Sequence, residues 1–247
     1  VPCDDDVAYT LLSLFITEES GRGLSFTLDD VAAAWKKYIT ISYTAEKVAL
    51  ENLQKGIPPE RAAELDNPYT EWIGADIRCD GYAYMAPGRP ELAAAAAETD
   101  ARISHRGEGV YGSRFFAAVI SAAFALSDTR AAVLEGLRHI PEDCALAAGI
   151  RWTLDTLPAV RTAHEAALLV DARYPGMNPV HTINNACLTV FALGLGGRDA
   201  GRVFASAVAM AHDCDCTAAT AGSIVGAAYG MDCLAEHWYK PFGDRIG

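Results

Sequence analysis

Positive charge is scarce in this sequence. Its 20 lysine and arginine residues are outnumbered by 32 aspartate and glutamate residues, which gives a formal net charge of −12 at pH 7. A field of this sign repels the phosphate backbone of nucleic acids. We therefore expect no nucleic-acid partner.

Signals for secretion and membrane insertion are also missing. The chain opens on acids rather than on a basic segment followed by an apolar one, and no apolar run reaches the ~18 to 20 residues of a membrane span. The seven cysteines are an odd number without the spacing of a disulfide framework, and no second pair follows Cys214 and Cys216 at zinc-site spacing. We expect a cytoplasmic protein without a membrane partner or a structural zinc ion.

Segments that alternate apolar and polar residues, as strands do, are short throughout. Alanine-rich stretches and apolar residues at three- and four-residue offsets, as in residues 7–16, predict helices instead. With 247 residues, 51% of them hydrophobic, and no Ser-rich linker, the sequence predicts one all-α domain over residues 1–247.

Local signals place several boundaries. Thr27, with acids following at Asp29 and Asp30, is typical of a helix start. Residues 67–90 show little helical period and are interpreted as a long ordered loop, a feature that is usually functional. In residues 217–229 and the glycine after them, Gly222, Gly226 and Gly230 form a thin face that predicts close packing of another helix.

Two groups of carboxylates interrupt this helical pattern. Asp4, Asp5 and Asp6 directly precede a helical segment, and Asp213 and Asp215 lie between alanine-rich segments. Adjacent carboxylates repel one another unless a cation or a positive helix end compensates them, and in apolar surroundings they are costly without a partner. The first group alone is more typical of a solvated helix cap, so the second group carries more weight.

The spacing of the second group favours a metal site. In an extended chain Asp213 and Asp215 lie on one face, and the helix that follows directs its amide groups to the same place. Oxygen ligands of this kind suit Mg²⁺, Ca²⁺ or Mn²⁺ rather than zinc. A bundle that brings both groups together would hold two such ions, which can orient substrate hydroxyls and activate water.

These motifs resemble those of the ADP-ribosylglycohydrolase family, which includes dinitrogenase-reductase-activating glycohydrolases, ADP-ribosyl-acceptor hydrolases and J1 crystallins. The family's early Thr-Asp-Asp motif is matched by Asp4 to Asp6, and its late Asp-x-Asp-Thr motif by the segment from Asp213 to Gly222. The resemblance implies a compact single-domain orthogonal helix bundle. It also implies two divalent cations, Mg²⁺ or Mn²⁺, with Asp4, Asp5, Asp6, Asp213, Asp215 and Cys216 as the metal ligands.

The match continues between these motifs. Residues 73–78 resemble the family's Asn-Gly-Ala-x-Met-Arg loop, and residues 103–105 resemble its Ile-Thr-His element, which Gly109 to Gly112 follow. The resemblance implies that Gly74, Ala75, His105, Gly109 and Tyr111 contact substrate.

Three further residue types are interpreted from their own chemistry. Trp72 and Tyr82 either stack on a flat part of the substrate or form a hydrophobic plug under the long loop. Asn184 and Asn185 are amides in an apolar helix, so they either line the pocket or tie two helices together.

The chain departs from the family pattern at several places. Asp4 and Cys216 replace threonines, and Ile73 replaces the asparagine of the substrate loop. The family's opening Gly-Asp-x-x-Gly segment, which can supply an acid near the metals, is apparently lacking. We expect a divergent member in which Asp5, Asp6 and Asp215 are catalytic, with the acid or base provided by Asp80 or Glu108 unless these are ordinary loop or cap carboxylates.

The predicted function is metal-dependent hydrolysis of a ribosyl glycosidic bond, in an ADP-ribosyl conjugate or in a smaller N-ribosyl compound such as a nucleoside. Only Arg78, Arg102 and Arg106 are at hand for a diphosphate. The alternative is a non-catalytic, crystallin-like or ligand-binding member. An isoprenoid-diphosphate lyase would need acids three to four residues apart on a helix, which the spacing of Asp213 and Asp215 does not provide. We expect a monomer or a weak homo-oligomer.

Overall fold

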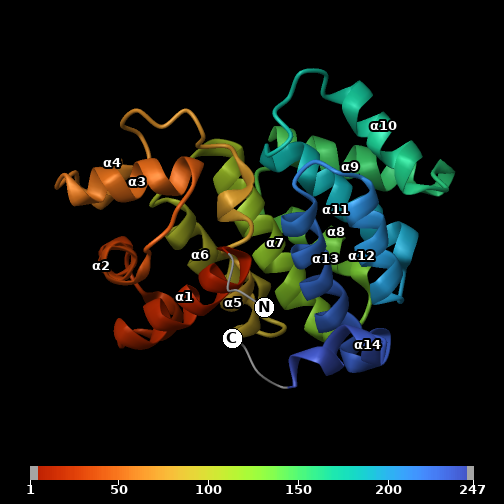
Figure 1. Cartoon of the computed structure of the whole chain (residues 1–247), viewed down its shortest axis with the longest axis horizontal. Coiled ribbons are helices and arrows are strands. Elements are labelled where there is room, and N and C mark those ends of the chain that lie inside the picture. The colour runs from red at the N-terminus through yellow and green to blue at the C-terminus, as the bar shows by residue number, and fades with distance from the viewer. Residues whose placement is uncertain (1–4, 244–247) are drawn as a thin grey trace.

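The computed structural model describes residues 5–243, so Asp4 lies outside the described residues. None of the described residues belongs to a strand, and the predicted all-α class is confirmed (Figure 1). The α-helices are α1 (Asp5–Glu19), α2 (Leu28–Tyr38), α3 (Thr44–Gln54), α4 (Pro59–Ala62), α5 (Asp80–Tyr84), α6 (Pro90–Ala101), α7 (Gly107–Leu126), α8 (Thr129–Gly136), α9 (Ala145–Thr156), α10 (Ala163–Arg173), α11 (Thr182–Gly196), α12 (Ala200–Ala209), α13 (Cys214–Tyr229) and α14 (Glu236–Tyr239).

Helix starts follow local sequence signals. Thr27 accepts a hydrogen bond from the amide of Asp30, and the Asp30 carboxylate accepts one from the amide of Thr27, so α2 begins with a capping box. Thr162 and Glu165 begin α10 in the same way. These reciprocal bonds satisfy amides that a helix leaves unpaired at its first turn, which is why the chain enters a helix at these residues.

Helix α7 is the central element of the bundle. It packs against α6, α8, α13 and α5, with α2 to α4 on one side of the molecule and α9 to α13 on the other (Figure 1). Most buried apolar side chains of the described chain belong to one continuous cluster that extends from α1 to α13. The core therefore joins both halves of the sequence, while the single domain over residues 1–247 stays a prediction.

The apolar character of α7 contradicts one sequence expectation. This helix is 20 residues long and, by length and composition alone, apolar enough to cross a membrane. However, 72% of its most apolar window is buried inside the fold. Because protein side chains already surround it, α7 has the surroundings of a core helix.

Two local expectations need correction. The segment 67–90 is not a continuous loop, because it contains a 3-10 turn at Ile73–Ala75 and helix α5. The glycine face of α13 is only partly a packing face: a side chain at Gly222 would approach Phe204 to 2.8 Å, but nothing lies within 4 Å of a Cβ at Gly226. Gly230, with φ of +66°, instead ends the helix, where a left-handed residue is favoured.

Candidate functional site

The first turn of α13 carries a compact group of metal-ligating side chains. One ligand atom from each of Asp213, Asp215 and Cys216 lies within 4.8 Å of the others. Asp215 belongs to the helix rather than to an extended segment and is exposed, so the expectation that both aspartates share an extended face in apolar surroundings is wrong. The short spacing still brings their carboxylates together because Asp213 directly precedes the helix that contains Asp215.

The loop before α13 is held in an unusual backbone conformation. Ala211 and His212 both have positive φ values, 60° and 59°, which non-glycine residues rarely adopt. The His212 ring contacts the Asp171 carboxylate at 2.9 Å and the Asn184 amide at 3.3 Å. Asn185 accepts a hydrogen bond from the Asp213 amide at 3.2 Å. Thus the two predicted asparagines fix the turn that presents Asp213.

The acids of α1 lie against the same group. Asp5 and Asp213 both line a cavity of about 170 Å³, which Cys216 also lines. Burial, together with the charges of Asp215 and Asp5, raises the pKa of Asp213 to about 6. Burial and the nearby charges of Asp6 and Asp213 raise the pKa of the Cys216 thiol. Asp5 of α1 and Asp213, at the start of α13, therefore line one cavity although they are far apart in the sequence. Among the described residues, the compact ligand group itself contains no acid of α1, so a metal shared by both acid groups stays a prediction.

This donor set fits a hard divalent cation. Its carboxylates repel one another, and burial together with the neighbouring negative charges raises the pKa of both Asp213 and Cys216. A bound cation would compensate those charges. Carboxylate oxygens are the ligands that Mg²⁺ and Mn²⁺ prefer, whereas the protonated thiol of Cys216 is a weaker donor than the hydroxyl usual at that position. Asp5, Asp6, Asp213 and Asp215 could therefore hold a metal.

A further carboxylate, missed by the sequence analysis, lines this cavity. Glu46 of α3 is only 3% exposed, and its Oε1 atom accepts a hydrogen bond from Arg78 at 2.6 Å. Gly74 makes this position possible, because a Cβ there would lie 2.7 Å from Glu46 Oε2 and even closer to Oε1. The predicted substrate residue Gly74 is thus a glycine that leaves room for a buried acid.

Arg78 lies beneath the cavity and holds Glu46 in place. Its guanidinium donates to Asp100 at 2.8 Å as well as to Glu46, and it lies over the rings of Tyr9 and Trp35. The side chain is fully buried, so it is not free to bind a phosphate.

The other two arginines considered for a diphosphate are also engaged. Arg102 pairs with Glu98 at 2.6 Å, and Arg106 pairs with Glu64 at 3.3 Å. Neither lines the cavity.

The remaining predicted substrate residues occupy different positions. Trp72 lines the cavity, whereas Tyr82 is buried in the core beside Phe26, so the plug interpretation holds for the latter. His105 and Ala75 are fully buried behind the cavity, and the His105 Nε2 atom is 4.0 Å from Glu46.

Burial, aided by nearby arginines, lowers the pKa of His105 well below its usual value, so the ring is neutral. Gly109 packs under the chain at Thr70, and Tyr111 is half-buried away from the cavity lining. Their part in substrate binding stays a prediction.

The two predicted acid or base candidates have other contacts. Glu108 accepts hydrogen bonds from the amides of Ala145 and Leu146, both at 2.9 Å, which caps α9. Asp80 accepts a hydrogen bond from the hydroxyl of Ser223, and burial raises its pKa to about 7. Neither residue lines the cavity, so the geometry favours structural roles for both.

A second buried acid, Asp76, was also missed. It follows Ala75 in the substrate loop, is fully buried, and accepts a hydrogen bond from the Thr182 hydroxyl. Burial raises its pKa well above the usual range, opposed by the hydrogen bond from Thr182 and by the charge of Arg78.

Comparison with known protein families now adds to this geometry. The sequence pattern of the ADP-ribosylglycohydrolase family matches residues 3–246. The chain belongs to this family. It is therefore a glycohydrolase of the ADP-ribosylglycohydrolase type, in a family whose members are generally metal-dependent and act on ADP-ribosylated substrates. A search of curated proteins found no match.

Proposed function

We propose that this ADP-ribosylglycohydrolase hydrolyses a ribosyl N- or O-glycosidic bond at the cavity between α1 and α13, with a pair of Mg²⁺ or Mn²⁺ ions. One observation carries the proposal: carboxylates from two distant helix starts, Asp5 and Asp213, line the same small cavity. Burial, with the nearby acids adding to it, raises the pKa of Asp213 to about 6. Structural carboxylates of a fold are normally separated or paired with cations, because their mutual repulsion is unfavourable.

The chain's own residues divide the work. Asp5, Asp6, Asp213 and Asp215 would hold the ions, which when bound supply positive charge that orients the ribose hydroxyls and lowers the pKa of water. Gly74 and Trp72 also line the cavity. Cleavage consumes one water: its oxygen bonds to the anomeric carbon, and the leaving group departs with the electron pair of the glycosidic bond.

Glu46 is the proposed general base. It lines the cavity with its carboxylate fixed by Arg78, and burial raises its pKa while Arg78 opposes that rise. An immobilised carboxylate of raised basicity is suited to take a proton from the attacking water. The proton that Glu46 takes from the water is returned to the leaving group as the glycosidic bond breaks, which regenerates the carboxylate and balances the hydrolysis.

The metal assignment is tested with Asp215→Ala and a matched control. Asp29 is also an exposed acid in the first turn of a helix, α2, but it does not line the cavity. We expect Asp215→Ala to lose Mn²⁺ binding in calorimetry and turnover, and Asp29→Ala to keep both. Turnover is screened over ADP-ribosylated protein, ADP-ribose derivatives and nucleosides. Full activity of Asp215→Ala would contradict the proposal.

The base assignment is tested with Glu46→Gln, which keeps the shape of the side chain and its acceptor for Arg78. We expect kcat to fall by about 100-fold or more while Mn²⁺ affinity changes little, because general-base catalysis typically contributes that much. The acidic limb of the kcat profile should disappear as well. If the profile keeps its shape, another residue is the base.

A non-catalytic member is the second candidate, and the observation that favours it is Cys216. This thiol occupies the position at which the family usually has a hydroxyl ligand. Such a protein would bind Mn²⁺ through its aspartates yet turn over none of the screened ribosides. Metal binding without turnover of any compound in the screen would therefore show that the protein is a non-catalytic member.

A further inference from the structure

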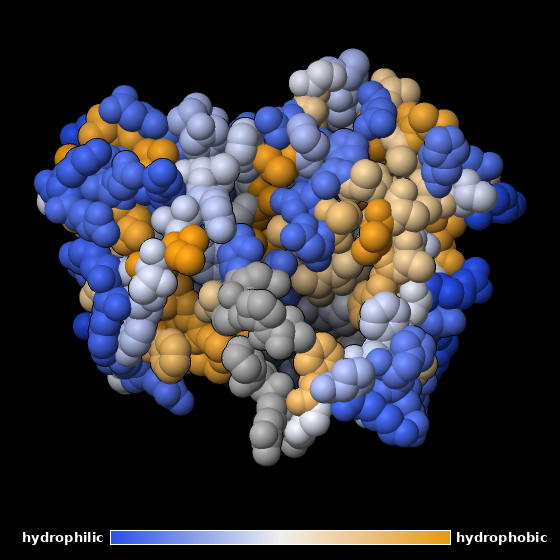
Figure 2. Space-filling view, viewed as in Figure 1, coloured by the Kyte–Doolittle hydropathy of each residue, from blue (hydrophilic) through white to orange (hydrophobic). Residues whose placement is uncertain are grey.

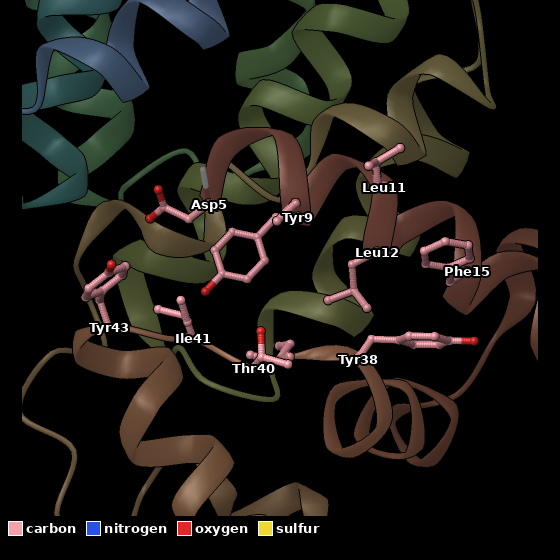
Figure 3. Close-up of a pocket in the computed structure, with 11 residues that line it drawn as sticks. Asp5, Tyr9, Leu11, Leu12, Phe15, Tyr38, Thr40, Ile41 and Tyr43 are labelled. Carbon is pink, nitrogen blue, oxygen red and sulfur yellow. The ribbon is translucent and has the colours of Figure 1, made fainter. Parts of the chain in front are cut away.

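A larger groove lies beside the cavity, between α1 and residues 38–43, which are the last residue of α2 and the segment that joins it to α3 (Figure 3). It has a volume of about 400 Å³, which is in the range of small-molecule sites. Leu12 and Phe15 of α1 form one wall, and Ile41 lies on the other. Hydrophobic surface also gathers over α1 on this face of the molecule (Figure 2).

The groove is continuous with the candidate active site. Asp5, Tyr9 and Tyr43 line both the groove and the small cavity. Figure 3 shows Asp5 and Tyr43 at one end of the groove, and Phe15 and Tyr38 at the other. The last two rings stack with their centroids 4.9 Å apart, so the far end is aromatic. A molecule whose ribose lies at the carboxylates can extend directly into this groove.

The charge of the residues that line the groove determines which substrate groups it can bind. Among the described residues that line the groove or the cavity there is no lysine or arginine, and Asp5 is the one charged side chain in the groove. Arg78, which binds the cavity-lining Glu46, is buried and paired with two carboxylates. A diphosphate in the groove would meet the Asp5 carboxylate with no lysine or arginine beside it, whereas an uncharged ring or alkyl group would bury apolar surface against Leu12 and Ile41.

We propose that this groove is the subsite for an uncharged, apolar or aromatic group attached to the ribose of the substrate, so that the enzyme acts on neutral ribosides rather than on diphosphate-bearing ones. The inference rests on the proposed function, because it takes the ribose to lie at the carboxylates. Ile41 is the residue best suited to probe it, since it is 70% exposed and its substitution leaves the core intact.

Calorimetry in the presence of Mn²⁺ tests the proposal with three probes: ribose, the uncleavable neutral compound phenyl 1-thioribofuranoside, and ADP-ribose. The wild type should bind the phenyl compound about tenfold tighter than ribose, since burying one ring supplies at least that factor. ADP-ribose should bind no tighter than ribose.

Ile41→Glu should remove most of the advantage of the phenyl compound and leave ribose binding unchanged. Val208→Glu is the matched control, because Val208 is also β-branched, is 54% exposed and lies on α12 away from the groove. This control should behave as the wild type.

The outcomes separate the two proposals. If ribose binds with Mn²⁺ but the phenyl compound binds no tighter, or if Ile41→Glu and Val208→Glu act alike, the groove assignment is overturned and the proposed function stands. Preference for ADP-ribose over the phenyl compound also overturns it. If neither ribose nor the phenyl compound binds in the presence of Mn²⁺, the proposed function fails and the groove assignment fails with it.

Discussion

Substitution of Gly74 tests whether the substrate loop and the buried acid Glu46 form one unit. A Cβ at Gly74 would lie 2.7 Å from Glu46 Oε2 and closer still to Oε1, so the Gly74→Ala methyl group and the carboxylate cannot share this space. The backbone of Gly74 is not in the left-handed region, so alanine adds no conformational strain. Any loss of stability is therefore steric.

The size of the effect follows from what Glu46 would lose. Its carboxylate is held by Arg78 at 2.6 Å, and both side chains are almost fully buried. Breaking one side of a buried ion pair costs about 3 to 5 kcal/mol, and partial displacement places Gly74→Ala near the lower figure. For a domain of this length each kcal/mol lowers Tm by about 2 to 4 °C, so we expect a loss of about 6 to 12 °C.

Thermal unfolding of Gly74→Ala beside Gly226→Ala is the assay. A Cβ at Gly226 meets nothing within 4 Å, and the residue lies inside α13, so alanine should stabilise this variant by up to about 1 kcal/mol through helix propensity. Opposite shifts in Tm are expected from the same chemical change. If Gly74→Ala melts within about 2 °C of the wild type, Glu46 is not fixed against the loop and its assignment as the base loses its structural ground.

Three further predictions concern other residues of the site region. The folded pKa of Asp80 is about 7, above its unfolded value, so the stability due to its proton is complete below about pH 4 and is lost as the pH rises to 7. Asp80→Asn should thus raise the free energy of unfolding by up to about 4 kcal/mol at pH 8, and Tm with it, and should change both very little at pH 4. An equal shift in Tm at both pH values would contradict this. Cys216→Thr should raise Mg²⁺ affinity in calorimetry about tenfold, because a hydroxyl is the harder ligand, and unchanged affinity would remove Cys216 from the metal site. Glu108→Ala should lower stability by about 1 to 2 kcal/mol through the lost cap of α9 and leave kcat unchanged, whereas a large fall in kcat would make Glu108 catalytic.

Features set by neighbouring residues could be predicted from the sequence. The all-α class and the start of α2 at Thr27 depend on helix propensity and capping, which act over one turn. The meeting of the two acid groups could be expected only through the family resemblance, because no local rule relates α1 to α13. The sequence predicts an extended Asp215, whereas the helix starts before this residue, at Cys214.

Glu46 is a different case, because a signal for it existed. In α3 the residues Glu46, Leu50 and Leu53 recur at offsets of four and three, and all three are buried, so helical periodicity alone places this acid on the inner face. Its partner Arg78 lies 32 positions away and could not be foreseen. The same holds for Glu108, which caps a helix 37 positions further along the chain.

The position of Arg78 bears on which substrates the site accepts. One buried guanidinium is shared between the carboxylates of Glu46 and Asp100. These three side chains together carry more negative than positive charge when both acids are ionised. Added to the carboxylates of Asp5 and Asp213 above it, this excess strengthens the attraction for divalent cations and weakens it for anionic groups. A cation bound at the aspartates would be largely neutralised by its own ligands, which leaves little positive charge for a diphosphate. The same charge distribution therefore favours both a metal site and an uncharged riboside.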